Sequence, residues 1–420
     1  MHVAGEDTVS DPSRKHSETW LVALSRKADP FFIRHAKPLR LLLLLLLLIE
    51  CARLVYQGKM GDFVPIYTGA TRLLAGEPLY LERTSAAYVY SPFIAFLFSP
   101  LTMLPLGFAK ALFFVLCCFS ALAAMRLTRQ IIWRDVREMP PETVGFYFLT
   151  LSSSLYFWWN ALGHGQSTPL MVALCIASYH YDLKEKPLVS GASLALALSF
   201  KPFPIVFLFF YAVQRRWRTV ASSMAFLALS LLLPLLWFGS SYREVLGRWT
   251  AVSRQQQYLH DITTQTHQSV SAMWYRFFGH ARPDPFALDI TDPAVCFIVL
   301  TWLAIISLVV LMAIRSRSGP AANPASSDAL FGACMICWAV LPPTAWKHYY
   351  VTLLFPAALV ARVALRGSAA SRPASHVLAS LVASLLILSV LRSPGHWLSL
   401  PVLGALLLLS CLFSCQRRSD

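Results

Sequence analysis

Charged residues are scarce in this chain of 420 residues. Asp, Glu, Lys and Arg make up 14% of the sequence, whereas hydrophobic residues make up 56% and the mean hydropathy is +0.56. A soluble domain has about 25% charged and about 45–50% apolar residues. This chain has too little polar surface to face water on all sides, so a soluble globular domain is excluded and lipid is the expected solvent.

The sequence also lacks the short motifs of many soluble enzymes. It contains no G-x-G-x-x-G, no Walker-type P-loop, no G-x-S-x-G elbow, no H-E-x-x-H and no D-x-D. Their absence argues against ATP-driven transport and against a nucleotide donor. Nothing in the sequence requires a metal or another cofactor. The nine cysteines lie almost wholly in apolar runs, so we expect buried structural residues even at the C-x-x-C of Cys334 and Cys337.

Acidic residues are outnumbered by basic ones. The sequence has 36 Lys and Arg against 21 Asp and Glu, which gives a formal charge of +15. A basic excess can indicate nucleic-acid binding. Here, however, the basic residues flank hydrophobic segments, as membrane topology signals do. We therefore expect membrane lipid, and no nucleic acid, among the partners of this protein.

Long apolar runs, in contrast, are abundant. They predict an all-α polytopic membrane protein, a bundle of about 10–12 transmembrane helices. One transmembrane domain, residues 39–415, is expected between cytoplasmic tails at 1–38 and 416–420. The predicted spans are residues 39–56, 108–127, 144–160, 168–181, 188–200, 203–213, 220–238, 294–314, 330–343, 349–363, 377–391 and 397–415.

Two of these spans, 188–200 and 203–213, are too short to cross a membrane alone. The sequence Lys201-Pro202-Phe203-Pro204 separates them. We expect a broken helix pair whose turn lies at membrane depth, where protein or a polar cavity must cover it.

The basic residues also predict the orientation of the chain. If the N-terminus is cytoplasmic, the inward-facing segments hold 23 of the 36 Lys and Arg residues. Two long segments, 57–107 and 239–293, then face outward. Because functional residues concentrate on loops that a rigid scaffold holds, we expect the chemistry on the extracytoplasmic face.

The first outward segment carries a carboxylate, Asp62, just after the first span. A carboxylate over the mouth of the bundle can take a proton from a hydroxyl as a general base. It can equally cap a helix that begins at the membrane surface. The residues alone leave both interpretations open.

Several short motifs follow one another along the chain. D-F-x-x-x-Y begins at Asp62, L-x-x-G-x-P-L-Y at Leu73 and Y-x-Y-x-P at Tyr88. In their order these motifs resemble glycosyltransferase family 87, over residues 39–365. The later matching elements are Gly165-Gln166, Lys201-Pro202-Phe203-Pro204, Gln268-Ser269 and Trp346-Lys347-His348-Tyr349-Tyr350, and the departures are Ser91, Ser167-Thr168 and His267.

The resemblance implies an enzyme of the GT-C fold that uses a polyprenyl-phosphate sugar, with mannose as the expected hexose. It implies transfer with inversion to a hydroxyl of a glycolipid or glycan acceptor. It also implies a multi-pass protein of the bacterial inner membrane that acts on the extracytoplasmic side. Both termini are then cytoplasmic.

The resemblance implies two catalytic candidates. Asp62 matches the family's loop aspartate and is the expected base. His348 matches the histidine of the last outer motif, where it can donate to the leaving phosphate or orient the acceptor. A histidine whose hydrogen bonds are satisfied at a helix end is the structural alternative, and the sequence does not decide between these roles.

Further candidates would bind the substrates. Lys201 is the only basic residue in its long apolar region, and a buried ammonium is costly without a partner such as the donor phosphate. The alternative is a lysine that extends toward water beside the proline break. Lys347 is a similar candidate at a span end. The motif match adds Gln166, Gln268 and Tyr350 as substrate-binding candidates.

Two other classes of function remain open, a lipid or solute transporter and a non-catalytic assembly subunit. A proton-coupled transporter usually has acidic residues within its spans. Here the acidic residues lie almost wholly in loops, with Glu50 as the clear exception. Many transporters also contain internal repeats, and this sequence shows none. The sequence therefore favours the enzyme.

Overall fold

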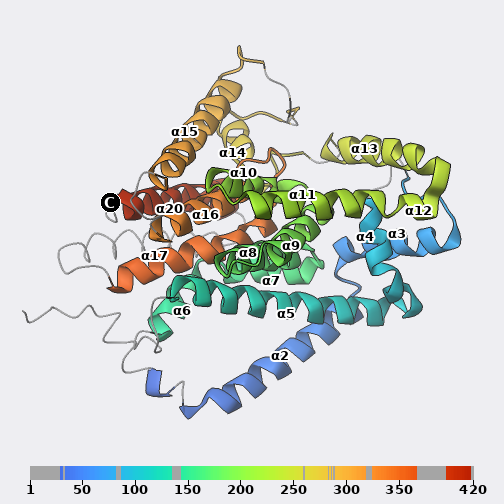
Figure 1. Ribbon diagram of the computed structural model, residues 1–420, viewed down its shortest axis with the longest axis horizontal. Coiled ribbons are helices and arrows are strands. Elements are labelled where there is room, and N and C mark those ends of the chain that lie inside the picture. The colour runs from blue at the N-terminus through green and yellow to red at the C-terminus, as the bar shows by residue number, and fades with distance from the viewer. Residues whose placement is uncertain are drawn as a thin grey trace, which may run out of the picture.

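The computed structural model of the chain is built from helices (Figure 1). It describes residues 29–31, 34–81, 87–134, 143–258, 261–281, 283–284, 286, 289–317, 324–366 and 394–417. Within this part of the chain there is no β-strand, and one isolated bridge pairs His267 with Trp346.

The helices differ widely in length, from single turns to more than seven turns. The α-helices are α2 (Ala36–Tyr56), α3 (Val64–Ala75), α4 (Pro92–Phe98), α5 (Leu106–Ile132), α6 (Thr143–Ser152), α7 (Leu155–His164), α8 (Thr168–Leu183), α9 (Pro187–Phe200), α10 (Val206–Val213), α11 (Trp217–Leu232), α12 (Leu235–Phe238), α13 (Tyr242–Tyr258), α14 (Val270–Phe277), α15 (Pro293–Arg315), α16 (Pro324–Val340), α17 (Leu354–Arg366), α19 (Pro394–Trp397) and α20 (Leu400–Arg417). The 3₁₀ helices are η1 (Gly61–Phe63), η2 (Ser99–Met103), η3 (Phe203–Ile205), η4 (Gly239–Ser241) and η5 (Lys347–Leu353).

Several helices have the length and composition of membrane spans. The leucines from Leu41 to Leu46 of α2 are half exposed or more, Leu44 for example at 53%, which suits a helix that faces lipid. The predicted all-α polytopic class is confirmed, whereas the number of spans stays a prediction. Among the described residues, the helical stretches long and apolar enough to cross a membrane are Leu106–Ile132, Trp217–Gln255, Pro293–Arg315 and Lys347–Leu365, and shorter apolar helices accompany them.

The predicted span 144–160 is two helices, α6 and α7, separated at Ser153 and Ser154. The Ser153 hydroxyl donates to the carbonyl of Leu149 at 2.9 Å. Serine side chains can satisfy backbone groups where a helix breaks. The apolar pattern of the sequence continues across this break and therefore does not predict it.

The predicted span 220–238 also differs in the structure. Its helix α11 ends at Leu232, and Pro234 then precedes the short helix α12. Proline has no N–H to continue the hydrogen-bonding pattern, which explains this end. Another predicted span, 377–391, lies outside the described residues.

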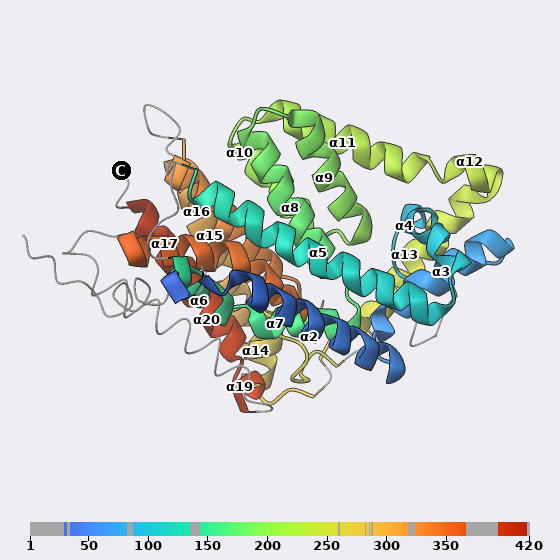
Figure 2. The ribbon, with the colours of Figure 1, turned by 90° about the horizontal axis from the view of Figure 1, so that it is seen from below.

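Helices α8 and α16 lie in the interior of the bundle, and α9 packs between α8 and the more exposed α11. Gly191 of α9 lies so close to α11 that an added Cβ would be 2.4 Å from the Cβ of Ser222. Every side chain of α16 from Asp328 to its end is buried, including Cys334 and Cys337. Helix α2 lies along α5 at one edge (Figure 1, Figure 2).

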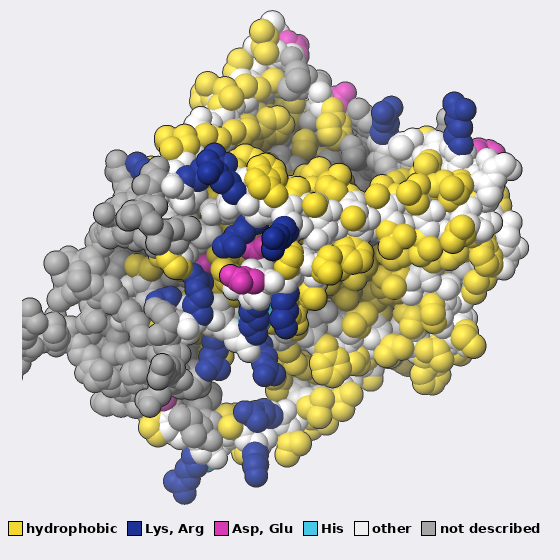
Figure 3. All heavy atoms as spheres, viewed as in Figure 1, with side chains coloured by type: hydrophobic (Ala, Val, Ile, Leu, Met, Phe, Trp, Pro, Cys, Tyr) yellow, Lys and Arg dark blue, Asp and Glu magenta, His cyan; other side chains and the backbone are white. Residues whose placement is uncertain are grey.

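The bundle has two chemically different ends, which we name the basic end and the site end. The basic end contains the C-terminal ends of α5, α8, α10 and α15, and most Lys and Arg side chains of the visible face form a band over this region (Figure 3). A buried carboxylate, Asp328, anchors it by pairing with Arg134 at 2.9 Å and accepting from the Tyr179 hydroxyl at 2.7 Å. The site end contains the C-terminal ends of α2, α7 and α9 and the start of α8 and η5.

Candidate functional site

Asp62 is held by the turn that follows α2. The chain passes through Met60, whose φ of 63° lies in the left-handed region, into the 3₁₀ turn η1. Phe63 is fully buried and stacks on Phe113 of α5, with 4.5 Å between the ring centroids. The backbone on both sides of Asp62 is therefore anchored, while its side chain remains 45% exposed.

A buried cation, Lys110 of α5, also holds this turn. Its Nζ donates to the carbonyl of Lys59 at 2.7 Å, three residues before Asp62. Sequence patterns assign Lys110 no role, because a single basic residue near a span end is usually a topology signal. Its isolation within an apolar run was the available clue.

The end of α7 packs directly against the same turn. The N–H of Met60 donates to the carbonyl of Gly163 at 3.3 Å. Gly165 follows with a φ of +69°, and a Cβ at this position would lie 2.9 Å from the Cβ of Met60. Glycine suits both the left-handed φ and the lack of space, and the close contact brings Gln166 to Asp62.

Three of the predicted site residues form one hydrogen-bonded chain. Gln166 Nε2 donates to Asp62 Oδ2 at 2.5 Å, and Lys201 Nζ donates to Gln166 Oε1 at 3.3 Å. His164 Nδ1 lies 3.9 Å from Asp62 Oδ2. Neither η1 nor α3 has a side-chain hydrogen bond at its N-cap, so the structure does not show Asp62 as a helix cap.

Lys201 lies between the two halves of the broken helix pair, as the sequence predicts. Helix α9 ends at Phe200, and Lys201 is extended before the proline break. Its Nζ is 5.9 Å from the centre of the Tyr90 ring and 5.4 Å from that of Tyr349, within reach of cation–π attraction. Burial, together with the nearby Asp62 charge, raises the pKa of Tyr90, so this phenol stays neutral.

His348 is buried in η5 at the same end of the bundle. Its ring lies parallel to Trp346 at 6.1 Å and perpendicular to Tyr349 at 4.8 Å. Within the described part of the chain, His348 Nε2 has no hydrogen-bond partner. The alternative of a histidine with all its hydrogen bonds satisfied is therefore not what the packing shows.

Gln268 and Tyr350 belong to a second cluster. Both side chains are fully buried. Gln268 Nε2 donates to the carbonyls of Gln265 and His396, each at 3.0 Å, and the Tyr350 hydroxyl donates to the Gln268 carbonyl at 2.7 Å. This packing favours a connecting role over the predicted contact with substrate.

Lys347 is half-buried at the start of η5. Its N–H donates to the carbonyl of Thr266 at 3.0 Å, next to the bridge between His267 and Trp346. The hydrogen bonds described for Asp62, Gln166 and Lys201 do not include it. The structure thus places Lys347 beside His348 and outside the hydrogen-bonded chain of the site.

The contact between Gly165 and Met60 leads to a stability prediction. Gly165→Ala adds a Cβ that meets the anchored Asp62 turn and must also adopt a positive φ. We expect a destabilisation of about 1–3 kcal/mol from overpacking, added to the backbone strain. Thermal unfolding of the purified protein in detergent measures the loss.

Gly76→Ala is the matched control for this substitution. Gly76 has the same φ of +69° but no atom within 4 Å of an added Cβ. It therefore carries the backbone strain without the clash. Equal losses in the two variants would contradict the packing of Gly165 on the Asp62 turn.

Known proteins resemble this chain in sequence. Residues 88–342 match glycosyltransferase family 87, a stretch that begins after Asp62 and ends before His348. The chain is 25% identical over 309 residues, 70% of its length, to 67% of the Mycobacterium tuberculosis polyprenol-phosphate-mannose-dependent alpha-(1-2)-phosphatidylinositol mannoside mannosyltransferase. The Mycolicibacterium smegmatis protein of the same description is 23% identical, over 68% of this chain and 66% of the relative.

A further relative differs in the acceptor that its description names. It is the Mycolicibacterium smegmatis polyprenol-phosphate-mannose-dependent alpha-(1-2)-phosphatidylinositol pentamannoside mannosyltransferase, 22% identical over 77% of this chain and 74% of the relative. The match to the family covers more than half of the chain. The protein therefore belongs to glycosyltransferase family 87.

Proposed function

We propose that this protein transfers mannose from a polyprenyl-phosphate donor to a hydroxyl of a glycolipid or glycan acceptor, with inversion. The observation that supports this most is the hydrogen-bonded chain of Asp62, Gln166 and Lys201. It joins a half-exposed carboxylate to a cation at one end of the bundle. Family membership and the descriptions of the relatives support the donor class.

The carboxylate serves the acceptor. Asp62 takes the proton of the acceptor hydroxyl as its oxygen attacks the anomeric carbon of the donor sugar. The bond from that carbon to the phosphate oxygen breaks, and its electron pair stays with the phosphate. A single displacement of this kind inverts the anomeric configuration.

The cation serves the donor. An ammonium has three donors, and Gln166 occupies one of those of Lys201. The others can bind the phosphate and balance the charge that it gains on leaving. His348 Nε2, buried and without a described partner, is a second group that can donate to the phosphate or orient the acceptor.

The role of Asp62 can be tested by removing its charge. Asp62→Asn can still accept the Gln166 hydrogen bond through its amide oxygen, so the fold should persist. Transfer should fall by at least about 10²–10⁴-fold, the usual contribution of a positioned base. Initial rates with a radiolabelled polyprenyl-phosphate mannose and purified protein measure this loss.

Asp289→Asn provides the control. Asp289 is an exposed aspartate of the second outward segment that accepts hydrogen bonds from Thr291, and Asn can keep these bonds. Its rate should match that of the unchanged protein. Binding of the donor should survive in Asp62→Asn, and a turnover in this variant like that of the unchanged protein would exclude Asp62 as the base.

Lys201 is tested by comparing two substitutions. Lys201→Gln removes the charge, and a hydrogen bond to a charged group is worth about 1.5–3 kcal/mol, so the donor KM should rise at least about tenfold. Lys201→Arg should keep part of the activity, since Arg also pairs with phosphate. Lys186→Gln at the basic end is the control. If both Lys201 variants lose folded protein equally, the residue is structural.

The orientation and the membrane form a second part of the proposal. We place the basic end in the cytoplasm of a bacterial cell and the site end outside its inner membrane. The concentration of Lys and Arg at one end supports this, because basic residues are retained on the cytoplasmic side (Figure 3). A polyprenyl-phosphate donor would then meet the site from the outer leaflet.

Cysteine labelling in intact cells tests the orientation. Ser240→Cys in η4 is exposed at the site end, whereas Lys184→Cys is exposed at the basic end. An impermeant maleimide should label the first variant above the background of the native cysteines and should label the second only after permeabilisation. The reverse pattern would invert the proposed orientation.

A further inference from the structure

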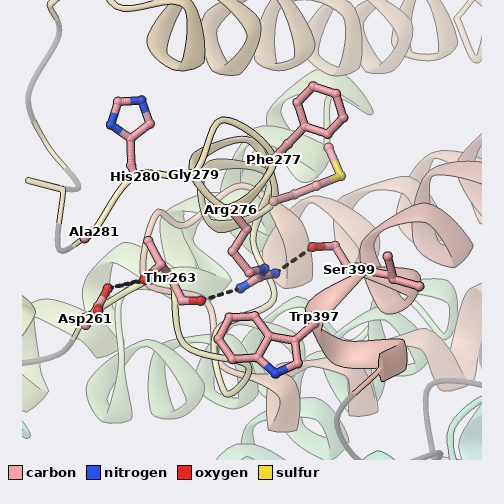
Figure 4. A pocket seen from close by; sticks show the side chains of 11 residues that line it. Asp261, Thr263, Arg276, Phe277, Gly279, His280, Ala281, Trp397 and Ser399 are labelled. Atoms are coloured by element: carbon pink, nitrogen blue, oxygen red, sulfur yellow. Dashed lines mark hydrogen bonds between the residues drawn. The ribbon is translucent and has the colours of Figure 1, made fainter.

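A pocket of about 520 Å³ lies at the site end, apart from the chain of Asp62, Gln166 and Lys201. It is formed by α14, by the segments that precede and follow α14, and by the end of α19 with the turn after it (Figure 4). This volume is within the range of small-molecule sites, about 300–1,000 Å³. The lining residues that matter for its chemistry are Asp261, Thr263, Arg276, His280, Trp397 and Ser399.

The cation of the pocket, Arg276, forms its hydrogen bonds with the protein itself. Arg276 Nη1 donates to the carbonyls of Thr264 at 3.0 Å and His267 at 2.9 Å, and Nη2 donates to the Ser399 hydroxyl at 2.6 Å. Burial lowers the pKa of Arg276 to about 10, so it stays charged at neutral pH. These bonds use both Nη1 protons and one Nη2 proton, and Nε, which has no described partner, is buried. The guanidinium is therefore held mainly by the protein, and the other groups of the pocket decide which ligand fits.

The other polar groups suit hydroxyls. Asp261 accepts from the N–H and the hydroxyl of Thr263, at 2.9 and 2.6 Å, and both bonds go to Oδ1. A carboxylate has two oxygens that accept hydrogen bonds, so Oδ2 is the atom that can accept from a ligand. His280 lies in the segment after α14, with Nε2 3.2 Å from Asp292.

An exposed indole forms the base of the pocket in Figure 4. Trp397 is 51% exposed although Ser399, two residues later, is buried. A flat aromatic face beside hydrogen-bond acceptors is the usual arrangement for a sugar ring, whose C–H face packs on the indole while its hydroxyls meet the polar groups. The net charge of the pocket, one Arg against one Asp, also suits a neutral ligand.

The pocket shares a wall with the proposed active site. The segment that Arg276 holds includes His267, which bridges to Trp346 and packs on it at 4.2 Å between ring centroids. Trp346 in turn lies against His348. A sugar in the pocket therefore lies on the side of η5 that faces the second outward segment.

We propose that this pocket binds non-reacting sugar residues of a carbohydrate acceptor. The proposal rests on the proposed function, because it assigns a place to the acceptor of that reaction. It makes Trp397 and Asp261 the residues that determine acceptor affinity. The reacting hydroxyl and the donor remain with Asp62 and Lys201.

Kinetics with purified protein test the proposal. Trp397→Ala should raise the KM for a mannose-containing acceptor about fivefold or more, since an aromatic contact contributes about 1 kcal/mol. The kcat and the donor KM should change less than about twofold, and Trp397→Phe should restore most of the affinity. Trp217→Ala removes a similarly exposed tryptophan at the basic end and should change neither constant.

Direct binding separates this proposal from the proposed function. A soluble mannose oligosaccharide should bind Asp62→Asn as it binds the unchanged protein, and Trp397→Ala should lose this binding in calorimetry. Asp261→Asn, which keeps the Thr263 turn, should weaken it severalfold and provides a second variant if Trp397→Ala does not fold. If the oligosaccharide binds but no mannose is transferred from polyprenyl-phosphate mannose, the sugar-binding pocket is supported and the proposed function is wrong. If both pocket variants transfer mannose with an unchanged acceptor KM, the pocket does not bind the acceptor. If Trp397→Ala changes stability alone, Trp397 is a membrane-surface tryptophan and the proposal is wrong.

Discussion

The site depends on one buried amide. Gln166 lies between Asp62 and Lys201, which are 104 and 35 residues away in the sequence. Its NH₂ group faces the carboxylate and its oxygen faces the ammonium, so the charges fix its orientation. In a direct ion pair, the carboxylate and the ammonium would bind each other and have fewer free positions for substrates. The amide gives each a partner and leaves the second carboxylate oxygen and the remaining ammonium protons for substrates.

Several irregular backbone segments of the described bundle meet where this amide lies. Met60 and Gly165 have positive φ, Lys201 is extended, and η5 replaces an α-helical turn. Such backbone needs partners wherever water is scarce, and here the segments supply them to one another. Met60 donates to Gly163, and the second outward segment bonds to the residues before η5. The regular helices hold these segments in place, so a flexible-looking set of loops becomes a defined surface.

Sequence patterns predicted the helical class, the broken pair around Lys201 and the candidate residues Asp62, Gln166 and Lys201. They could not predict that Gln166 joins the other two, because that contact depends on how Gly165 packs against Met60. The break at Ser153 was missed because both halves of the span are equally apolar. For Gln268 and Tyr350 the motif gave the position but not the direction of the side chain, and both point into the protein. Arg276 gave no signal, since its partners are mainly backbone carbonyls.

The short helix η5 connects the two parts of the site end. A 3₁₀ helix has about three residues per turn, so neighbouring side chains point about 120° apart. Tyr349 thereby reaches Lys201 and packs on Phe203, while Tyr350 turns the other way and bonds to Gln268. His348, the residue before Tyr349, takes the third direction. One turn of helix therefore faces the lysine assigned to the donor on one side and the segment beside the sugar pocket on the other. A side chain that must act between a donor and an acceptor is well placed on such a helix, because packing against the segments on both sides fixes the position of the helix.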